Sequence, residues 1–336
     1  MKPLDWHVPE FRSLIAANAP LPHALLVRGA RGIGKLVFVR ALAQTLLCTS
    51  RVEEDAYGCG TCPACGWFDA GGHPDYRQIE PAAASTRNGA DEGEKKSIII
   101  SIDQIRGLGE FISLSSHQGG PKVVVIHPVE MLNLNAANAL LKSLEEPPPR
   151  THFLLVTHRP HQVLPTLKSR CRQIALRAPD AARGSDWLAA QGMRDDPGLA
   201  LAQTGNAPLL SLELNDSEYW GMRATFLRLL TAPDLDPLAA AEALREFPIH
   251  HVVSWLQKWS YDLVYSRSVG TVRYNPDHAD ALCEFATRTD PLAAVRFHRE
   301  MVKLQRIVHH PLNARLFMSQ LLLSYRELVQ TPLQAA

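Results

Sequence analysis

Short apolar runs divide the first half of the chain. Segments 24–27, 122–126 and 153–156 are almost entirely apolar, as is typical of strands buried on both faces of a parallel sheet. Segments 75–80 and 173–176 are shorter and more polar, and they predict two further strands. Strands separated by helical patterns indicate an α/β fold built on a parallel sheet.

Between these runs, apolar residues recur every three or four positions, which predicts amphipathic helices. Residues 1–23 contain one such pattern and are expected to cover an edge of the sheet. A second helix ends near Cys48, a third begins at Ser101, and a fourth spans 133–146, where Pro147 stops it. The residues expected to face inward on these helices are Trp6, Phe11, Leu14, Ile15, Phe38, Leu42, Leu46, Ile102, Ile105, Leu108, Ile112, Leu134, Ala137, Leu141 and Leu144.

After Pro179 the pattern contains helices alone. Because 336 residues exceed what one core normally holds, we predict three domains: an α/β domain over 1–178, a small three-helix domain over 179–214 and an all-α domain over 215–336. Segment 82–97 is small and polar without periodicity, so we expect a mobile loop there. Near the C-terminus, two apolar faces fit either an internal core or an interface: Phe297, Met301, Leu304 and Val308 on one, Leu321, Leu322, Tyr325, Leu328 and Val329 on the other.

The segment 29–36, GARGIGKL, follows the first strand and opens a helix. In this context the pattern G-x-x-x-x-G-K-[ST] forms a phosphate-binding loop. Gly29, Gly32 and Gly34 allow backbone amides to curl around phosphate oxygens, and Lys35 adds positive charge to the helix N-terminus. Leu36 stands where a Ser or Thr hydroxyl would hold Mg²⁺. Residual phosphate or nucleotide binding through Lys35 stays open, but normal metal binding is not expected.

The strand over 122–126 is followed by His127 and Pro128. Phosphate-loop ATPases carry acidic residues here, which order Mg²⁺ and polarise the attacking water. Neither His127 nor Pro128 can do this, and Glu130, two residues further on, is expected to point elsewhere. Together with Leu36, this loss predicts that the chain does not hydrolyse ATP.

Four cysteines lie close together in the sequence. Cys59, Cys62 and Cys65 are each separated by two residues in a Gly/Pro-rich knuckle, and Cys48 precedes them. In a reducing compartment such a cluster favours metal over disulfides, and four thiolates suit a closed, structural Zn²⁺ site. An iron–sulfur cluster and unligated thiols are the alternatives, and His73 could replace Cys48 as the fourth ligand.

Charge and hydropathy narrow the class of protein. Lys and Arg number 35 against 34 Asp and Glu, a net charge of +1. No basic cluster accompanies the cysteines, as a zinc-ribbon nucleic-acid binder would require. No apolar run approaches the length of a membrane span, and the N-terminus carries no secretory signal. We therefore expect a cytoplasmic protein with no membrane partner.

The order of these motifs resembles a known family. The phosphate loop, the four-cysteine knuckle, the segment NAANALLKSLEEPP over 135–148 and the turn Ser169-Arg170-Cys171 are similar to the bacterial DNA polymerase III clamp-loader subunits, which are AAA+ ATPases. The missing acidic residues narrow the resemblance to the delta-prime type, since the gamma/tau type shares the knuckle and the turn but keeps a full ATP site. The resemblance covers about residues 23–180, and beyond them it rests on helical character and length.

This resemblance implies a RecA-like AAA+ domain followed by a helical lid and a helical collar. It implies assembly with gamma/tau and delta subunits into a hetero-pentameric ring of the nucleoid-associated replisome, which opens the sliding clamp and places it on primed DNA. It also implies that Arg170 acts in trans as an arginine finger on a neighbour's ATP. A surface salt bridge or a cap on the preceding helix is the alternative role for Arg170.

Two functions from different classes follow from these observations. A non-catalytic subunit explains three separate differences from an active ATPase. Leu36 replaces the hydroxyl that holds Mg²⁺, and His127 and Pro128 replace the acidic residues. The lid turn over 205–208 also lacks the arginine that an active AAA+ lid places over the γ-phosphate. An active ATPase of the gamma/tau type with a divergent metal site needs a substitute for each. ATP turnover by the purified chain distinguishes the two.

Overall fold

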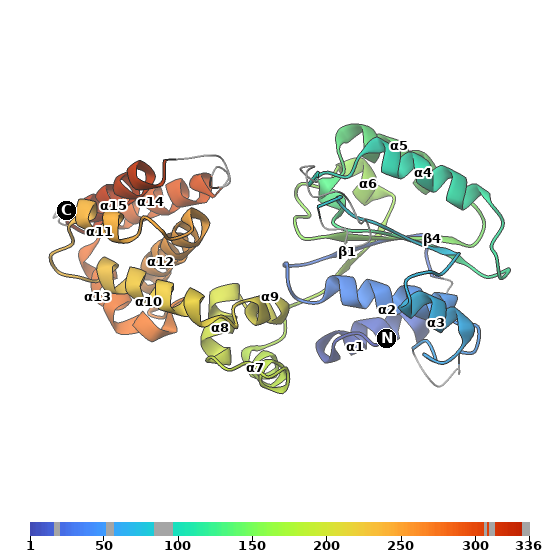
Figure 1. The fold of residues 1–336 in the computed structure, drawn as a ribbon, viewed down its shortest axis with the longest axis horizontal. Coiled ribbons are helices and arrows are strands. Elements are labelled where there is room, and N and C mark those ends of the chain that lie inside the picture. The colour runs from blue at the N-terminus through green and yellow to red at the C-terminus, as the bar shows by residue number, and fades with distance from the viewer. Residues whose placement is uncertain (17–20, 52–56, 84–96, 306–307, 309–312, 331–336) are drawn as a thin grey trace. The chain divides into compact units, whose positions relative to one another are not determined.

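The computed structural model of the chain describes residues 1–16, 21–51, 57–83, 97–305, 308 and 313–330. It divides into two compact units, Met1–Pro179 and Asp180–Ala336 (Figure 1). The boundary lies within one residue of the predicted end of the α/β domain. The further division of the second unit near residue 214 stays a prediction.

The first unit is built on a five-stranded parallel sheet, as predicted. Its strands are β1 (Ala24–Arg28), β2 (Tyr76–Ile79), β3 (Lys122–Ile126), β4 (Thr151–Thr157) and β5 (Arg172–Ala175). They run in the order β2-β3-β4-β1-β5, so consecutive strands are joined by crossovers that the helices make. The central strands are buried on both faces, which explains their continuous apolar sequences.

Helices cover both faces of this sheet (Figure 1). The 3₁₀ helix η1 (Asp5–His7) and the helices α1 (Val8–Ala16), α2 (Lys35–Leu47) and α3 (Pro63–Asp69) lie on one face. On the other lie α4 (Ile102–Ser113), α5 (Leu134–Glu145) and α6 (Pro165–Ser169), with the short η2 (Val129–Met131) at the end of β3. The parallel sheet with helical layers confirms the predicted α/β architecture.

Local capping fixes the start of two helices. Ser101 caps α4 through a reciprocal capping box with Gln104, which confirms the predicted start. The Asn133 side chain accepts from the Ala136 amide at 2.8 Å and caps α5. Leu134 is therefore the first helical residue and is 64% exposed, so the prediction that it faces inward was wrong. The buried face of α5 is formed by Ala136, Ala137, Leu140 and Leu144, and Leu141 is half-buried.

The second unit is entirely helical in its described residues. Three short helices come first: α7 (Ala181–Ala190), α8 (Pro197–Thr204) and α9 (Pro208–Glu213). The remaining elements are α10 (Ser217–Leu230), α11 (Pro237–Ala243), α12 (Ile249–Val269), η3 (Pro276–His278), α13 (Ala279–Arg288), α14 (Pro291–Leu304) and α15 (Ala314–Gln330).

Aromatic residues fill the core of this unit. Trp255 and Trp259 of α12 are fully buried and donate their indole N–H groups to the hydroxyls of Tyr219 (2.9 Å) and Tyr325 (3.0 Å), as buried tryptophans usually require. Most residues of the two C-terminal apolar faces, Phe297, Met301, Val308, Leu321, Leu322, Tyr325 and Leu328, lie in the same core. The internal-core interpretation of those faces is therefore the correct one for these residues.

Two further sequence predictions concern the segment 82–97 and membrane-spanning helices. Most of the predicted loop over 82–97 lies outside the described residues. Within the helices that are described, none combines the length and the apolar character needed to cross a membrane.

Candidate functional site

The predicted phosphate loop connects β1 to α2 in the expected way. Gly32 and Gly34 adopt positive φ angles of 78° and 96°, which glycine alone adopts without strain. At Gly29 a side chain would place its Cβ 2.5 Å from the carbonyl oxygen of Leu176. The chain thus keeps the backbone shape of a phosphate loop, although its sequence departs at Leu36.

Lys35 is the first residue of α2 and is only 2% exposed. Its ammonium group donates to the carbonyl of Ala30, inside the loop itself. Burial lowers the pKa of Lys35 to about 8, and the negative charge of Glu130 opposes that shift. The amine that would neutralise a phosphate is therefore turned inward and used by the loop.

The N-terminal segment packs directly against this loop. The indole N–H of Trp6 donates to the carbonyl of Ile33 at 3.0 Å, and the His7 Nε2 lies 3.0 Å from the carbonyl oxygen of Arg177. Leu4 occupies the space beside Gly34, since a Cβ there would lie 2.3 Å from the Leu4 Cδ1. The prediction for residues 1–23 named only a sheet edge, and periodicity carried no signal for this contact with the loop.

Two histidines face each other where β3 and β4 end. The Nε2 atoms of His127 and His158 are 3.0 Å apart. Burial, with a smaller effect of the Lys35 charge, lowers the pKa of His127 to about 4 and that of His158 to about 3. Both rings are therefore neutral at pH 7. Sequence reasoning gave His127 no role and missed His158, for which the only available signal was its position directly after a buried strand.

Glu130 also lies at this edge, and the prediction that it points elsewhere was wrong. The turn η2 brings its carboxylate back, so that one oxygen accepts from the backbone amide of His158 at 2.9 Å. The other carboxylate oxygen is buried without a hydrogen-bond partner among the described residues. Glu130 thus ties the end of β4 to the end of β3 and partly compensates the charge of Lys35.

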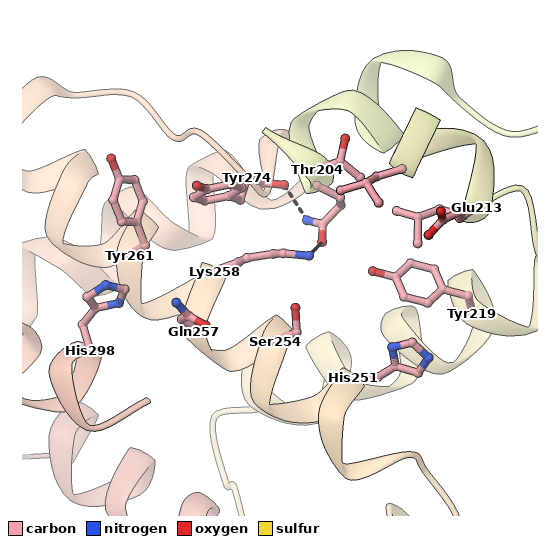
Figure 2. A pocket seen from close by; sticks show the side chains of 13 residues that line it. Thr204, Glu213, Tyr219, His251, Ser254, Gln257, Lys258, Tyr261, Tyr274 and His298 are labelled. Carbon is pink, nitrogen blue, oxygen red and sulfur yellow. Dashed lines mark hydrogen bonds between the residues drawn. The ribbon is translucent and has the colours of Figure 1, made fainter. Parts of the chain in front are cut away.

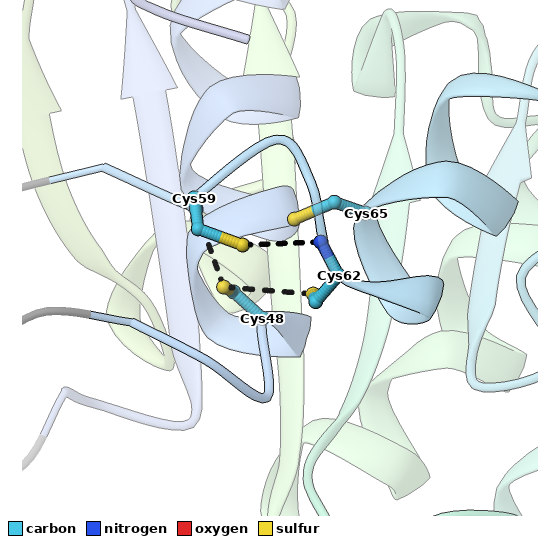
Figure 3. A group of neighbouring side chains, drawn as sticks. All are labelled: Cys48, Cys59, Cys62 and Cys65. Atoms are coloured by element: carbon cyan, nitrogen blue, oxygen red, sulfur yellow. Dashed lines mark hydrogen bonds between the residues drawn. The ribbon is translucent and has the colours of Figure 1, made fainter.

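The four cysteines predicted as ligands come together (Figure 3). Cys48 follows α2, Cys59 lies in the next loop, and Cys62 and Cys65 flank the start of α3. The four sulfur atoms all lie within 4.8 Å of one another. Backbone amides of Cys59 and Cys62 donate to the sulfurs of Cys48 and Cys59, both at 3.3 Å.

This donor set fits a structural metal ion such as zinc. Four sulfurs at such separations match tetrahedral thiolate ligation with no open position, and amide donors to sulfur stabilise thiolates. Among the described residues the cluster consists of the four cysteines alone, so His73 does not replace Cys48; its Nδ1 instead accepts from the Asp75 amide at 3.0 Å. A bound ion would crosslink the end of α2 to the start of α3.

Arg170 directly follows α6 and caps its C-terminus. Its guanidinium forms an ion pair with Glu145 at the end of α5 and donates to the Thr166 carbonyl at 3.1 Å. The side chain is 34% exposed. In the chain by itself, then, Arg170 makes the salt bridge and helix contact that were the alternative to a finger.

Comparison with known proteins finds relatives that are all subunits of DNA polymerase III. The family model described as "DNA polymerase III, delta subunit" matches residues 7–180. The DNA polymerase III subunit delta′ of Pseudomonas aeruginosa is 36% identical, over 79% of this chain and 76% of its own length. That of Escherichia coli is 30% identical, over 87% and 85%.

A solved gamma-subunit-related protein of DNA polymerase III from Thermotoga maritima is 20% identical and covers 97% of this chain and all of its own. Its TM-score of 0.46 marks only a loose structural similarity. The family match and the two relatives, added to the altered phosphate loop and the cysteine cluster, place the chain in the family of DNA polymerase III delta-prime subunits.

Proposed function

We propose that this chain is a non-hydrolysing subunit of a DNA polymerase III clamp loader in the bacterial cytoplasm. It supports the loading of the sliding clamp onto primed DNA, in a ring with gamma/tau and delta subunits. One observation carries the non-hydrolysing role: the Lys35 ammonium donates to the Ala30 carbonyl, beside a leucine that cannot ligate Mg²⁺. Phosphoryl transfer depends on positioned cations. In this loop the lysine is bonded to the loop's own backbone, and position 36 has no hydroxyl to hold Mg²⁺.

Within that ring, Arg170 is proposed to reach the ATP of an adjacent subunit. A guanidinium is planar, always charged and forked to meet phosphate oxygens. The ion pair with Glu145 is partly exposed, and such pairs contribute little to stability. Exchange of Glu145 for a phosphate is therefore a small energetic step, and an arginine finger supplied in trans raises the rate by about 10³–10⁵.

The remaining features have structural roles in this proposal. Zn²⁺ held by Cys48, Cys59, Cys62 and Cys65 stabilises the knuckle, as four thiolates leave no position for water. Residues 179–214 form the lid and residues 215–336 the collar that holds the ring together.

The decisive experiment reconstitutes the clamp loader with Arg170→Ala. DNA-stimulated ATP turnover and clamp loading should fall by at least about tenfold, since the finger acts on transition-state charge. Arg172→Ala is the matched control, because Arg172 is an exposed arginine two residues away, and it should leave both rates unchanged. Assembly of both variants is checked by gel filtration. Full activity of an assembled Arg170→Ala complex would remove Arg170 from the mechanism.

A second measurement separates the subunit from an active ATPase of the gamma/tau type. The isolated chain should show no Mg²⁺-dependent ATP turnover above background. Turnover that Lys35→Ala abolished would instead establish an ATPase with a divergent metal site.

A further inference from the structure

A pocket of about 450 Å³ lies in the second unit (Figure 2). Residues of α8 and α9 form one wall, and residues of α10, α12 and α14 and the segment before η3 form the rest. Pockets of this size bind small organic molecules. Neither the ATP site nor the cysteine cluster contributes a residue to it.

Lys258 of α12 extends into this pocket (Figure 2). Its ammonium donates to the Gln203 side-chain oxygen at 3.2 Å, which leaves two N–H donors free for a ligand. In the described part of the chain no carboxylate is ion-paired with it. Burial, together with the positive charge of Arg223, lowers the pKa of Lys258 to about 8. Lys258 is half-buried, and a partly desolvated cation without a close counterion is costly. Glu213 also lines the pocket but is exposed and forms no ion pair with Lys258, so an anion bound beside the lysine would offset that cost.

The wall opposite Lys258 is held rigidly. Gln203 donates through Nε2 to the carbonyl of Tyr274 at 2.5 Å and to the Asn275 side chain at 3.1 Å, which fixes its oxygen toward the lysine. The buried Asp262 carboxylate in turn accepts from the backbone amides of Tyr274 and Asn275 at 2.8–3.1 Å. A preorganised polar wall lowers the cost of binding a ligand.

Other groups suit the rest of an organic anion. The Tyr219 hydroxyl accepts from Trp255 at 2.9 Å, so its own proton is available, and Figure 2 shows the hydroxyl directed toward the same space as the lysine amine. Tyr261 and Tyr274 meet edge to face with ring centroids 5.2 Å apart, and Leu214 adds apolar surface. The pocket therefore combines a cation with a wall for a flat, apolar group.

We propose that this pocket binds a small organic anion, with its phosphate or carboxylate oxygens on Lys258 and Tyr219 and a planar ring against Tyr261 and Tyr274. A purely structural lysine would need no cavity beside it, and methionine would fill its place at lower cost. The proposal does not depend on the role assigned to Arg170 or on the state of the phosphate loop.

The test is isothermal titration of the full chain with phenyl phosphate, benzoate, inorganic phosphate and the uncharged benzamide. Phenyl phosphate or benzoate should bind at least about tenfold more tightly than benzamide, because a charge-assisted hydrogen bond is lost with the anion. Inorganic phosphate should bind more weakly than phenyl phosphate. The tighter of the two aromatic anions identifies the head group.

Two variants locate the site. Lys258→Met should weaken binding of the aromatic anions at least about tenfold. Lys303→Met, at an exposed lysine of α14, should leave their affinity unchanged. If Lys258→Met fails to fold, Ser254→Leu, which fills the pocket from α12, should abolish binding. Equal binding of benzamide and the anions, or unchanged affinity in a folded Lys258→Met or Ser254→Leu variant, would overturn the proposal.

Discussion

At the scale of single residues, the edge of the sheet near the phosphate loop contains unusual protonation states. Lys35 is buried with a lowered pKa, and the neighbouring His127 and His158 are neutral because burial and that lysine disfavour their charged forms. The three groups are compatible as long as the two imidazoles stay uncharged. Acidification should therefore lower the stability from about pH 6.5 downward, because the unfolded chain takes up these protons before the folded chain does.

The expected pH dependence has a definite sign. The unfolded chain binds protons on both histidines near pH 6.5, while the folded chain binds them only at about pH 4 and about pH 3. Stability should therefore fall as the pH drops from 6.5 toward 4. In urea titrations between pH 6.5 and pH 4, the double variant His127→Gln/His158→Gln should remove several kcal/mol of that loss. His161→Gln, at an exposed histidine, should keep the full slope, and an equal slope in the double variant would contradict the argument.

Glycine has opposite effects on folding stability at two positions of the first unit. Gly34 has a φ of 96°, and an added Cβ would lie 2.3 Å from Leu4, so Gly34→Ala should destabilise the fold by about 1–3 kcal/mol. Gly107 lies exposed inside α4 with no atom within 4 Å of a built Cβ, so Gly107→Ala should stabilise it by about 0.5–1 kcal/mol. Denaturant unfolding of both variants checks the pair, and a stabilised Gly34→Ala protein would be inconsistent with the packed loop.

At the scale of elements, the cysteine cluster joins the well-packed helix α2 to the short helix α3. Helix α3 has seven residues, below the length at which a helix is stable by itself, and Cys62 and Cys65 are buried at its start. We expect about one Zn²⁺ per chain by elemental analysis. Chelation, or Cys62→Ser, should remove the metal and lower the melting temperature by several degrees. Cys283→Ser on α13 is the matched control and should retain the metal. A metal-free native chain would refute this role.

Sequence reasoning succeeded for elements whose signal is local. The five strands, the start of α4 at Ser101 and the four-cysteine cluster all follow from apolar runs, capping and spacing. It failed where chain segments meet in space. Glu130 returns to the sheet edge through η2, and Trp6 contacts Ile33 across 27 residues. Leu134 was misplaced because packing in the core decides which face of α5 is buried, and that face carries Ala136, Ala137, Leu140 and Leu144.

At the scale of the whole molecule, each of the two units closes its own core. The altered phosphate loop, the cysteine cluster and Arg170 all belong to Met1–Pro179, whereas the Lys258 pocket belongs to Asp180–Ala336. The change from strands to helices at Pro179 made this boundary visible in the sequence. The pocket was not predictable, because its lining comes from helices spread over about a hundred residues and has no common motif.

The covered loop has a consequence for how this protein can evolve. Trp6 bonds the loop, Leu4 fills the gap at Gly34 and Lys35 bonds Ala30, so these contacts hold the loop in its packed form. A gain of ATPase activity would therefore have to pass through variants in which these contacts are broken and the fold is less stable. Leu36→Thr combined with His127→Asp and Pro128→Glu should restore no measurable ATP turnover. Activity in that triple variant would mean that only the catalytic side chains had been lost.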